Sequence, residues 1–587
     1  MEVAGSDKNA CPGFDGSGFV YDPVQVGANN LKTISFGENN KIEYIGPGAF
    51  RNQSHLTYID FGTASDGVTI QIGNGAFIGA GNNGYLAENG VDKELGEGIE
   101  TLTLPANLTQ INYGAFELAR VKNLVFSDGC LVTDLPGSFM DPYGSGESHE
   151  HPSLDSASLG ANALQTVSFG ENNSLEKIGP SSFRNQSHLT AVDFGSPKSD
   201  EVLLTIDGGA FVGAGNNLYL VENGIDDELC EGIETLTFPA NLEALWSEFM
   251  NARIKNLVFS DGCLLSYIPS NFLGSSGTGA CHGHPSLDSG PLGGNILETV
   301  SLGQNNHLTS IGNGAFRNQS HLTSIDFGTP ASDDTLLTIA SGAFVGVGNN
   351  GYLVEQGVED ELSDGIETLI FPSNLSSLGS AFEYARIKNI VFSDGCGITE
   401  IPSHFMGILG SGCNGQPGKQ ADYTYDPNVG KSYVTNERFV EELPSIAANA
   451  LETVTFGNNN NISDIYYGAF QNQSHMTSID FGTSEAELTI WSGAFAGVGN
   501  NAYLVENGVD ESLGEGIELE LPANLVDLKN GAFTFSGLKS LSFAEGIGVE
   551  TYNHGVFQDV NVMEELVLGS DYPSDTLEGG TSAGARS

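Results

Sequence analysis

The sequence predicts a right-handed solenoid of short parallel β-strands with little helix, rather than a string of globular domains. The first observation is a block at residues 314–328 that occurs four times in total along the 587-residue chain, with the first three copies equally spaced. The second observation is a smaller pattern, apolar-x-x-apolar-x-apolar, that recurs several times within each long repeat. Self-similarity at a fixed period is the sequence signature of a solenoid. The phenylalanines at the centre of the four blocks are Phe50, Phe183, Phe316 and Phe470.

The first long repeat contains four smaller units, each with one predicted strand, a turn, and an Ala-Phe or Ser-Phe step. The predicted strands cover residues 31–37, 56–62, 99–105 and 121–127. Side chains alternate along an extended strand, so Ile34 and Phe36 are expected to face inward and Thr33 and Ser35 outward. We expect the phenylalanine of each step to form a second inward ladder on the opposite wall.

The later long repeats follow the same plan. Their strands start at Leu164, Leu189, Ile233, Ile254, Leu297, Leu322, Ile366, Ile387, Leu451, Met476, Ile517 and Leu538. The strand at 517–522 is one residue shorter than its counterparts, which predicts a local irregularity there. Residues 1–30 are interpreted as an N-terminal cap or frayed segment, residues 31–569 as the solenoid, and residues 570–587 as a disordered tail.

Two kinds of insertion interrupt the units. An acidic insertion covers residues 88–100 and recurs from Glu222, Glu355 and Glu506. A second kind follows the fourth strand of a repeat, at about residues 141–161, 274–294 and 407–447. Insertions in solenoids form loops on one side, where binding sites often lie.

The segments at 322–327 and 337–344 carry a family pattern: a strand of the form Leu-x-x-Ile-x-Phe, then Leu-Thr-Ile and Gly-Ala-Phe. Together with the strand at 233–239 and the step at 311–316, they resemble the BspA-like leucine-rich repeat family over about residues 31–569. The family commonly has a cysteine shortly after the Ala-Phe step, where this chain has Asn-Gln-Ser. The resemblance implies a leucine-rich repeat solenoid of the α/β type in a non-enzymatic surface or secreted protein that acts in adhesion and protein binding.

The net charge of −53, from 74 acidic and 21 basic residues, disfavours nucleic acid and anionic membranes as partners. Solubility alone remains an alternative explanation of this charge. No stretch is long and apolar enough for membrane insertion. The first residues carry no signal peptide pattern, while the family resemblance favours an extracellular or cell-surface location. We expect a monomer.

Three residue groups raise the question of metals and disulfides. Cys130, Cys263 and Cys396 occupy one repeat position, and they are interpreted either as buried thiols or, in a secreted protein, as including the pairs Cys263–Cys281 and Cys396–Cys413. Closely spaced histidines give a weak metal signal without a zinc-site pattern. These histidines are His149, His151, His282 and His284.

The acidic insertion raises calcium as the one ion that the sequence leaves open. Asp92, Glu94, Glu97 and Glu100 lie among glycines and could supply oxygen ligands, although the spacing does not match an EF-hand. The alternative is a solvated charged loop. No cofactor is predicted, and no nucleophile motif, Walker loop or Rossmann fingerprint indicates an enzyme. His321 and Arg317 are expected to be solvent-exposed on a corner.

The candidate ligand-binding surface is the outward side of the strands. Its positions are mostly short hydroxyl residues, while one strand in each long repeat presents an aspartate. The candidate residues are Tyr58, Asp60, Asp193, Ser324, Asp326, Ser478 and Asp480. Spaced carboxylates on a flat polar surface suit an extended, repetitive or basic partner. The alternative, in which each aspartate only hydrogen-bonds the next turn, stays open.

The sequence therefore predicts a non-enzymatic binding or adhesion protein that recognises a protein or a cell-surface ligand. Three alternatives remain: an intracellular scaffold, a structural surface-coat protein, and a calcium-dependent protein associated with polysaccharide.

Overall fold

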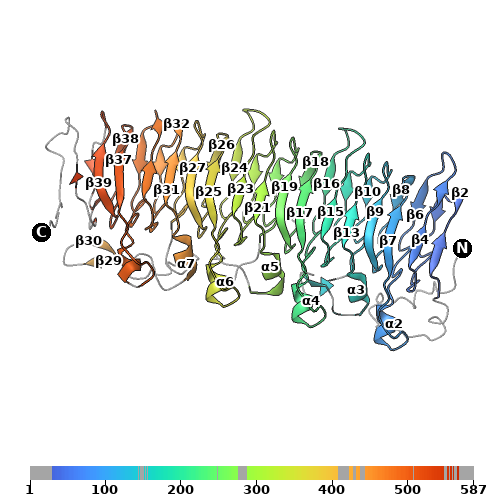
Figure 1. Ribbon diagram of the computed structural model, residues 1–587. Helices are drawn as coiled ribbons and strands as arrows, with labels where there is room; N and C mark the ends of the chain where they lie inside the picture. Colours follow the sequence, from blue (N-terminus) through green and yellow to red (C-terminus); the bar gives the residue numbers. More distant parts are fainter. Residues whose placement is uncertain are drawn as a thin grey trace. The chain divides into compact units, whose positions relative to one another are not determined.

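The computed structural model describes residues 30–142, 144–145, 151–152, 154, 156–246, 249–274, 287–407, 422–426, 431–435, 443–506, 508–547, 551–553, 555–557, 560 and 565–566 (Figure 1). The chain forms two compact units. Unit 1 comprises Met1–Leu273, Asp288–Leu297 and Leu302–His307, and unit 2 comprises Gly274–Leu287, Glu298–Ser301 and Leu308–Ser587. The predicted terminal cap and tail lie outside the described residues, apart from residue 30.

In unit 1, the predicted strands form a wall of parallel strands, here called the ladder wall. Its strands are β1 (Thr33–Ser35), β4 (Tyr58–Asp60), β7 (Ile99–Leu104), β9 (Val121–Phe126), β13 (Thr166–Ser168), β15 (Ala191–Asp193), β17 (Ile233–Phe238) and β19 (Ile254–Phe259). Matching positions pair across neighbours, such as Ser35 with Asp60 and Ser168 with Asp193. The buried–exposed alternation of β7 and β9 follows the apolar pattern, so their outward and inward faces are as predicted.

A second set of short parallel strands forms the opposite wall of unit 1. Its strands are β3 (Tyr44–Ile45), β6 (Ile70–Ile72), β8 (Leu108–Ile111), β10 (Asp134–Leu135), β14 (Lys177–Ile178), β16 (Leu204–Ile206), β18 (Leu242–Leu245) and β20 (Tyr267–Ile268). Sequence analysis predicted one strand per unit and missed these. Several of these strands are only two residues long, which is too short to show a periodic pattern. They form because their backbones pair with short strands of the neighbouring coils.

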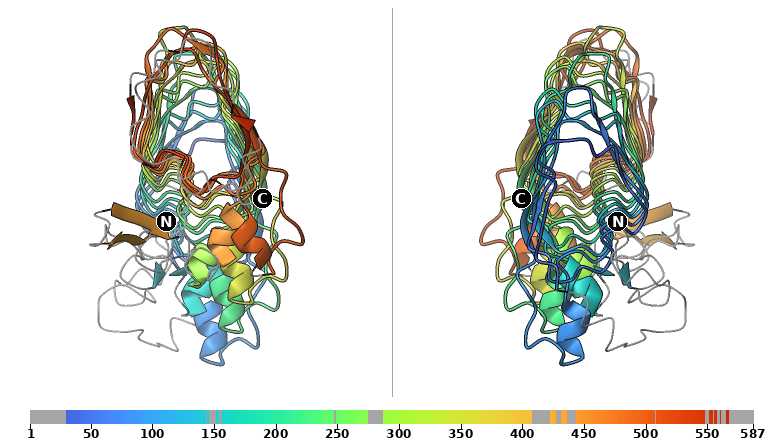
Figure 2. Two further views of the ribbon diagram at one scale, coloured as in Figure 1. Left: turned by 90° about the vertical axis from the view of Figure 1, so that its left-hand side faces the viewer. Right: turned by 90° about the vertical axis from the view of Figure 1, so that its right-hand side faces the viewer.

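Short helices and additional strands of unit 1 lie in the insertions and turns. The helices are α2 (Gly84–Glu88), α3 (Ser156–Ala161), α4 (Leu218–Glu222) and α5 (Ser289–Gly294). The strands are β2 (Glu38–Asn40) with β5 (Thr63–Ala64), and the antiparallel pair β11 (Gly144–Ser145) and β12 (His151–Pro152). Figure 2 shows that the helices gather at one narrow end of the coils, whose long sides are the two walls.

Unit 2 repeats this plan. Its ladder wall consists of β21 (Thr299–Ser301), β23 (Ser324–Asp326), β25 (Ile366–Phe371), β27 (Ile387–Phe392), β31 (Thr453–Phe456), β34 (Ser478–Asp480), β37 (Ile517–Leu521), β39 (Leu538–Phe543) and β41 (Glu565–Leu566). Its opposite wall consists of β22 (Ser310–Ile311), β24 (Leu337–Ile339), β26 (Leu375–Leu378), β28 (Glu400–Ile401), β33 (Asp464–Ile465), β36 (Leu488–Ile490), β38 (Leu525–Leu528) and β40 (Thr551–Tyr552). The helices are α6 (Gly351–Glu355), α7 (Leu443–Ala448) and α8 (Ala502–Glu506), and the remaining strands are β29 (Asp422–Asp426), β30 (Lys431–Thr435), β32 (Asn458–Asn460) and β35 (Thr483–Ser484).

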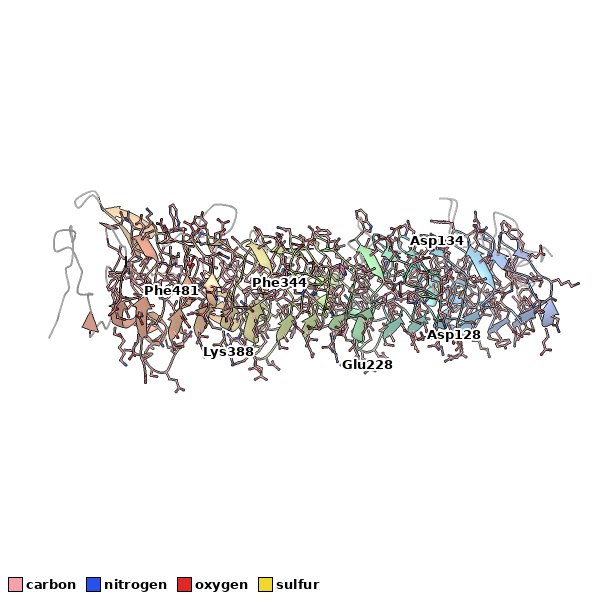
Figure 3. All side chains as sticks on the ribbon, turned by 90° about the horizontal axis from the view of Figure 1, so that it is seen from above. Asp128, Asp134, Glu228, Phe344, Lys388 and Phe481 are labelled. Carbon is pink, nitrogen blue, oxygen red and sulfur yellow. The ribbon has the colours of Figure 1, made fainter. Side chains whose placement is uncertain are left out.

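Phenylalanine rings fill the space between the two walls. In unit 2, Phe316 stacks on Phe344 with ring centroids 5.2 Å apart, and Phe344 stacks on Phe382 at 5.0 Å. Phe327, on the ladder wall, meets Phe344 edge to face at 6.3 Å. Figure 3 shows Phe344 and Phe481 between the walls and Lys388 at the outer margin. The predicted second phenylalanine ladder is therefore confirmed.

Two finer expectations have different outcomes. Phe183, Phe316 and Phe470 are fully buried, but Phe50 is partly exposed, and it lies in the first coil that the structure describes. The predicted irregularity is confirmed, because the register between β37 and β39 shifts between Ile517 and Glu518.

These results confirm a solenoid of short parallel strands with little helix. Among the described residues, none of the helices is long and apolar enough to span a bilayer.

Candidate functional site

The ladder wall presents the predicted candidate residues outward. Tyr58, Ser324 and Ser478 are exposed, and each stands two positions before an aspartate on the same strand. In unit 1, Asp60 and Asp193 are separated by β7, β9 and β13, which is roughly 19 Å at the usual strand spacing. In unit 2, Asp326 and Asp480 are separated in the same way by β25, β27 and β31. The structure therefore places aspartates at regular intervals and does not bring them together.

Each ladder aspartate also has a role in the turn after its strand. The backbone N–H of the glycine two residues later donates to the aspartate Oδ1. The donors are Gly62 at 2.8 Å to Asp60, and Gly195, Gly328 and Gly482 at 2.9 Å to Asp193, Asp326 and Asp480. In unit 1, the hydroxyl of the preceding strand donates to the other oxygen, as Ser35 does to Asp60 at 2.9 Å and Ser168 to Asp193 at 3.0 Å. These bonds hold the carboxylates in one orientation.

The turn requires glycine because the preceding coil lies very close. Gly62 has a φ of +64°, and a Cβ there would stand 1.9 Å from the carbonyl oxygen of Gly37. A Cβ at Gly195 would likewise stand 1.9 Å from the carbonyl oxygen of Gly170, and one at Gly482 would stand 2.0 Å from that of Gly457. The aspartate and the glycine therefore act together to let one coil stack on the next.

The ladder surface is less uniformly polar than predicted. Beside the expected hydroxyl residues, the strands that carry no aspartate present β-branched apolar side chains at the same outward row, including Val125, Val258 and Val391. Ile370 is 54% exposed. In unit 1, the row between two carboxylates thus contains hydroxyl residues and a partly exposed valine, as in Thr103, Val125 and Ser168 before Asp193.

The acidic insertions are held by a recurring arrangement that sequence analysis missed. The Nε2 atom of His188 lies 2.9 Å from the Asp226 carboxylate, which also accepts a hydrogen bond from Asn217 at 2.7 Å. Asn217 donates as well to the carbonyl of Glu228 and accepts from the N–H of Cys230. The equivalent histidine–acid pairs are His55 with Asp92 at 3.0 Å, His321 with Glu359 at 3.1 Å, and His475 with Asp510 at 3.0 Å.

This arrangement corrects the expectation for the corner residues. His321 is about one-third exposed and bonded to Glu359, rather than simply solvated. Arg317 is half-buried, and burial lowers the pKa of its guanidinium. The recurrence of His321 and of the Asn349-Asn350 pair in each long repeat was the available signal, although the sequence does not show which side chains meet.

Partly buried arginines join the first three acidic insertions to the helix of the following insertion. In unit 1, Arg120 donates through Nε to the carbonyl of Gly96 at 2.8 Å and through a terminal nitrogen to that of Gly160, in α3, at 2.9 Å. In unit 2, Arg386 connects Ser363 to Ala447, in α7, at 2.9 and 2.7 Å. The insertions form an ordered edge of the coils.

The predicted calcium ligands do not converge. The Asp92 carboxylate faces His55, while Glu97 and Glu100 both pair with Lys122, at 2.8 and 2.9 Å. Across the part of the chain that the structure describes, histidine, cysteine and acidic side chains form no group able to hold a metal ion.

The sulfur and histidine predictions are tested only in part. Cys130, Cys263 and Cys396 are buried free thiols, and burial raises the pKa of Cys263 to about 11. The suggested partners Cys281 and Cys413 lie outside the described residues, as do His149, His282, His284 and the side chain of His151.

Comparison with known proteins identifies the repeat. A model of the BspA type leucine rich repeat region matches the chain in six copies, over residues 26–84 and 293–355. No curated protein matches.

Among solved structures, a leucine-rich repeat protein from Bacteroides ovatus is 13% identical with a TM-score of 0.34, covering 80% of this chain and 92% of that one. The pneumococcal vaccine antigen PcpA is 16% identical with a TM-score of 0.28, covering 78% and 92%. A leucine rich cell surface protein from Faecalibacterium prausnitzii is 14% identical with a TM-score of 0.26, covering 74% and 88%. The units within residues 26–84 and 293–355 therefore match leucine-rich repeats of the BspA type, a repeat class that is generally not enzymatic.

Proposed function

We propose that this protein is a non-enzymatic adhesion or binding protein at the cell surface, and that the ladder wall recognises an extended basic protein partner. The observation that carries the proposal is the regular presentation of the ladder aspartates. In each unit, two carboxylates of identical orientation face outward with three strands between them.

The physical argument combines charge and geometry. A partner with cationic side chains at a regular spacing can meet several carboxylates at once, and each further contact then forms at a high effective concentration. The apolar side chains between the carboxylates, such as Ile370, add contact area that binding would remove from water. The net charge of −53 would accelerate the approach of such a partner.

The experiment must separate binding from the turn role of the aspartates. The combined Asp193→Asn and Asp326→Asn variant keeps an oxygen that can accept the glycine N–H, but it removes two negative charges. A matched control replaces Asp200 and Asp333, exposed carboxylates in the loops after β15 and β23, with asparagine. Adhesion of the purified chain to immobilised polylysine should weaken more than tenfold for the ladder variant relative to the control.

Equal adhesion by the ladder variant and the control would contradict the proposal and direct attention to the insertion edge. Adhesion that depends on added calcium would instead favour the polysaccharide-associated alternative.

A further inference from the structure

The opposite wall of unit 2 carries an aromatic row at two positions where the other long repeats have no aromatic side chain. In three of the four repeats, the residue after the inward isoleucine of the short strand is a glycine, whereas in the fourth it is Tyr466 after β33. The glycines are Gly46, Gly179 and Gly312. One strand further, Trp491 follows β36, where the third repeat has Ala340. The repeat architecture folds with small residues at these positions, so packing of the coils does not require the aromatic rings.

The row is partly exposed on the outer side of the sheet β28-β33-β36-β38-β40. Trp491 is 37% exposed, and its ring centroid lies 5.6 Å from that of Tyr466. The registers of this sheet place Glu400 beside Asp464, and Thr489 between Asp464 and Asp527. Aromatic rings and carboxylates therefore form two adjacent rows on one face.

Lys529 shows how this surface holds a cation. Its ammonium lies over the Trp491 ring, 5.5 Å from the centroid, and it also pairs with the Asp527 carboxylate. A cation near an aromatic face and a carboxylate is stabilised by the ring quadrupole and by charge. The Trp491 ring and the Asp527 carboxylate are thus both in contact with a lysine of the chain itself.

Tyr466 presents the same combination without a cation from the chain. The Asp464 carboxylate accepts a hydrogen bond from Trp491 Nε1 at 2.8 Å, which fixes its position beside Tyr466. The charge of Asp464 raises the pKa of Tyr466, as do burial and the charge and hydrogen bond of Glu400. Within the described ranges, no lysine, arginine or histidine pairs with Glu400 or Asp464.

We infer that Tyr466, Asp464 and Glu400 form a binding site for a lysine or arginine side chain of a basic protein segment, on the wall opposite the ladder. Charge complementarity selects this occupant, because three carboxylates and one ammonium leave the surface negative. A neutral sugar ring is the less suitable occupant, since Lys529 already covers a face of Trp491. The inference rests on a different wall from the proposed function and stands independently of it.

The test measures binding of a short fluorescent peptide of alternating lysine and alanine to the full chain, by anisotropy. The site variant combines Asp464→Ser with Tyr466→Gly, which copies Ser310 and Gly312 of the third repeat. A control, Asp333→Ser, removes the same charge from an exposed loop. The site variant should bind about tenfold more weakly than the control, and the difference should shrink at high salt.

Two further variants keep the outcome decisive. Tyr466→Phe should retain most of the affinity, because the ring face remains. Tyr466→Leu keeps the apolar volume but removes the ring, so it should lose the affinity, and it replaces the glycine variant if that variant does not fold. The ladder variant Asp326→Asn with Asp480→Asn should preserve the tenfold difference, which separates this site from the proposed function. Equal affinity of the site variant and the control would overturn the inference. So would binding of a neutral oligosaccharide that depends on Tyr466 while peptide binding does not.

Discussion

The two walls of unit 2 differ in how strictly their outward residues follow the repeat. On the ladder wall, Asp326 and Asp480 stand at equivalent positions, and each accepts a hydrogen bond from the N–H of the glycine in the turn after its strand. On the opposite wall, Gly312 and Tyr466 stand at equivalent positions although their side chains have nothing in common. A side chain that serves the backbone turn is constrained by stacking, whereas one that only faces solvent can diverge. The comparison teaches that the recurrence of the ladder aspartates includes a contribution from the turn, whereas the change from Gly312 to Tyr466 is free of that constraint.

The largest effect should come from the core that both walls share. Phe316→Ala removes a fully buried ring stacked on Phe344, and it should cost about 3–5 kcal/mol of local stability. Phe50→Ala should cost less, about 1–2 kcal/mol, because that ring is already partly exposed. Hydrogen exchange of the strands next to each site measures both values. Equal losses would mean that the inward ladder does not determine stability.

The next effect concerns a buried carboxyl of unit 1, that of Glu117, which directly follows the core residue Phe116. Burial, followed by the charge of Asp141, raises the pKa of Glu117 from 4.5 to about 7. The folded state therefore loses stability as the pH rises from about 4.5 to 7, since the carboxyl must ionise in a buried position. Glu117→Gln should be more stable than the wild type by roughly 3 kcal/mol at pH 8, with no advantage near pH 4.

Thermal unfolding across this pH range tests the Glu117 prediction. Glu383 is the equivalent residue in unit 2, and its pKa is raised by burial alone. Glu383→Gln should therefore give a smaller gain. A gain that is larger at pH 4 than at pH 8 would show that the carboxyl is stabilising in its ionised form.

A smaller effect separates the two roles of a ladder aspartate. Asp193→Ala removes the acceptor of the Gly195 N–H and should cost about 1 kcal/mol, whereas Asp193→Asn should cost less than half of that because its side-chain oxygen still accepts the bond. Chemical denaturation of the two variants measures the difference. If both variants lose the same stability, charge rather than the turn bond explains the recurrence of this aspartate.

The smallest effect concerns the insertion edge at acid pH. Burial acts to raise the pKa of Asp226, but the hydrogen bonds from His188 and Asn217 outweigh it and hold the pKa below its ordinary value of 3.8. The stabilisation by this carboxylate is therefore present above pH 3.8 and is lost as the pH falls further. Amide exchange of α4 should accelerate below about pH 4, relative to an unfolded peptide at the same pH, before the strands do so.

A variant identifies the cause of this acid loosening. His188→Gln should already show faster exchange in α4 at neutral pH and a weaker dependence on acid. Unchanged protection of α4 from pH 6 to pH 3 in the wild type would exclude the proposed role of the pair.

The sequence by itself determined the solenoid, the inward ladders and the irregular strand at Ile517. These features depend on the alternation of apolar residues along a chain that must bury one side of every strand, and such alternation is visible in the residue order. The outward candidates Asp60, Asp193, Asp326 and Asp480 were found for the same reason, since an outward position follows once the inward positions are known.

Only the tertiary structure decided which polar side chains meet. His188 and Asp226 are 38 residues apart, and Trp491 reaches Asp464 across 27 residues, so both pairings arise from coils that stack at a particular register. The two-residue strands of the opposite wall likewise exist only because a neighbouring coil supplies their hydrogen-bond partners. Burial leaves a periodic mark on a sequence, whereas contacts between coils depend on the geometry of stacking.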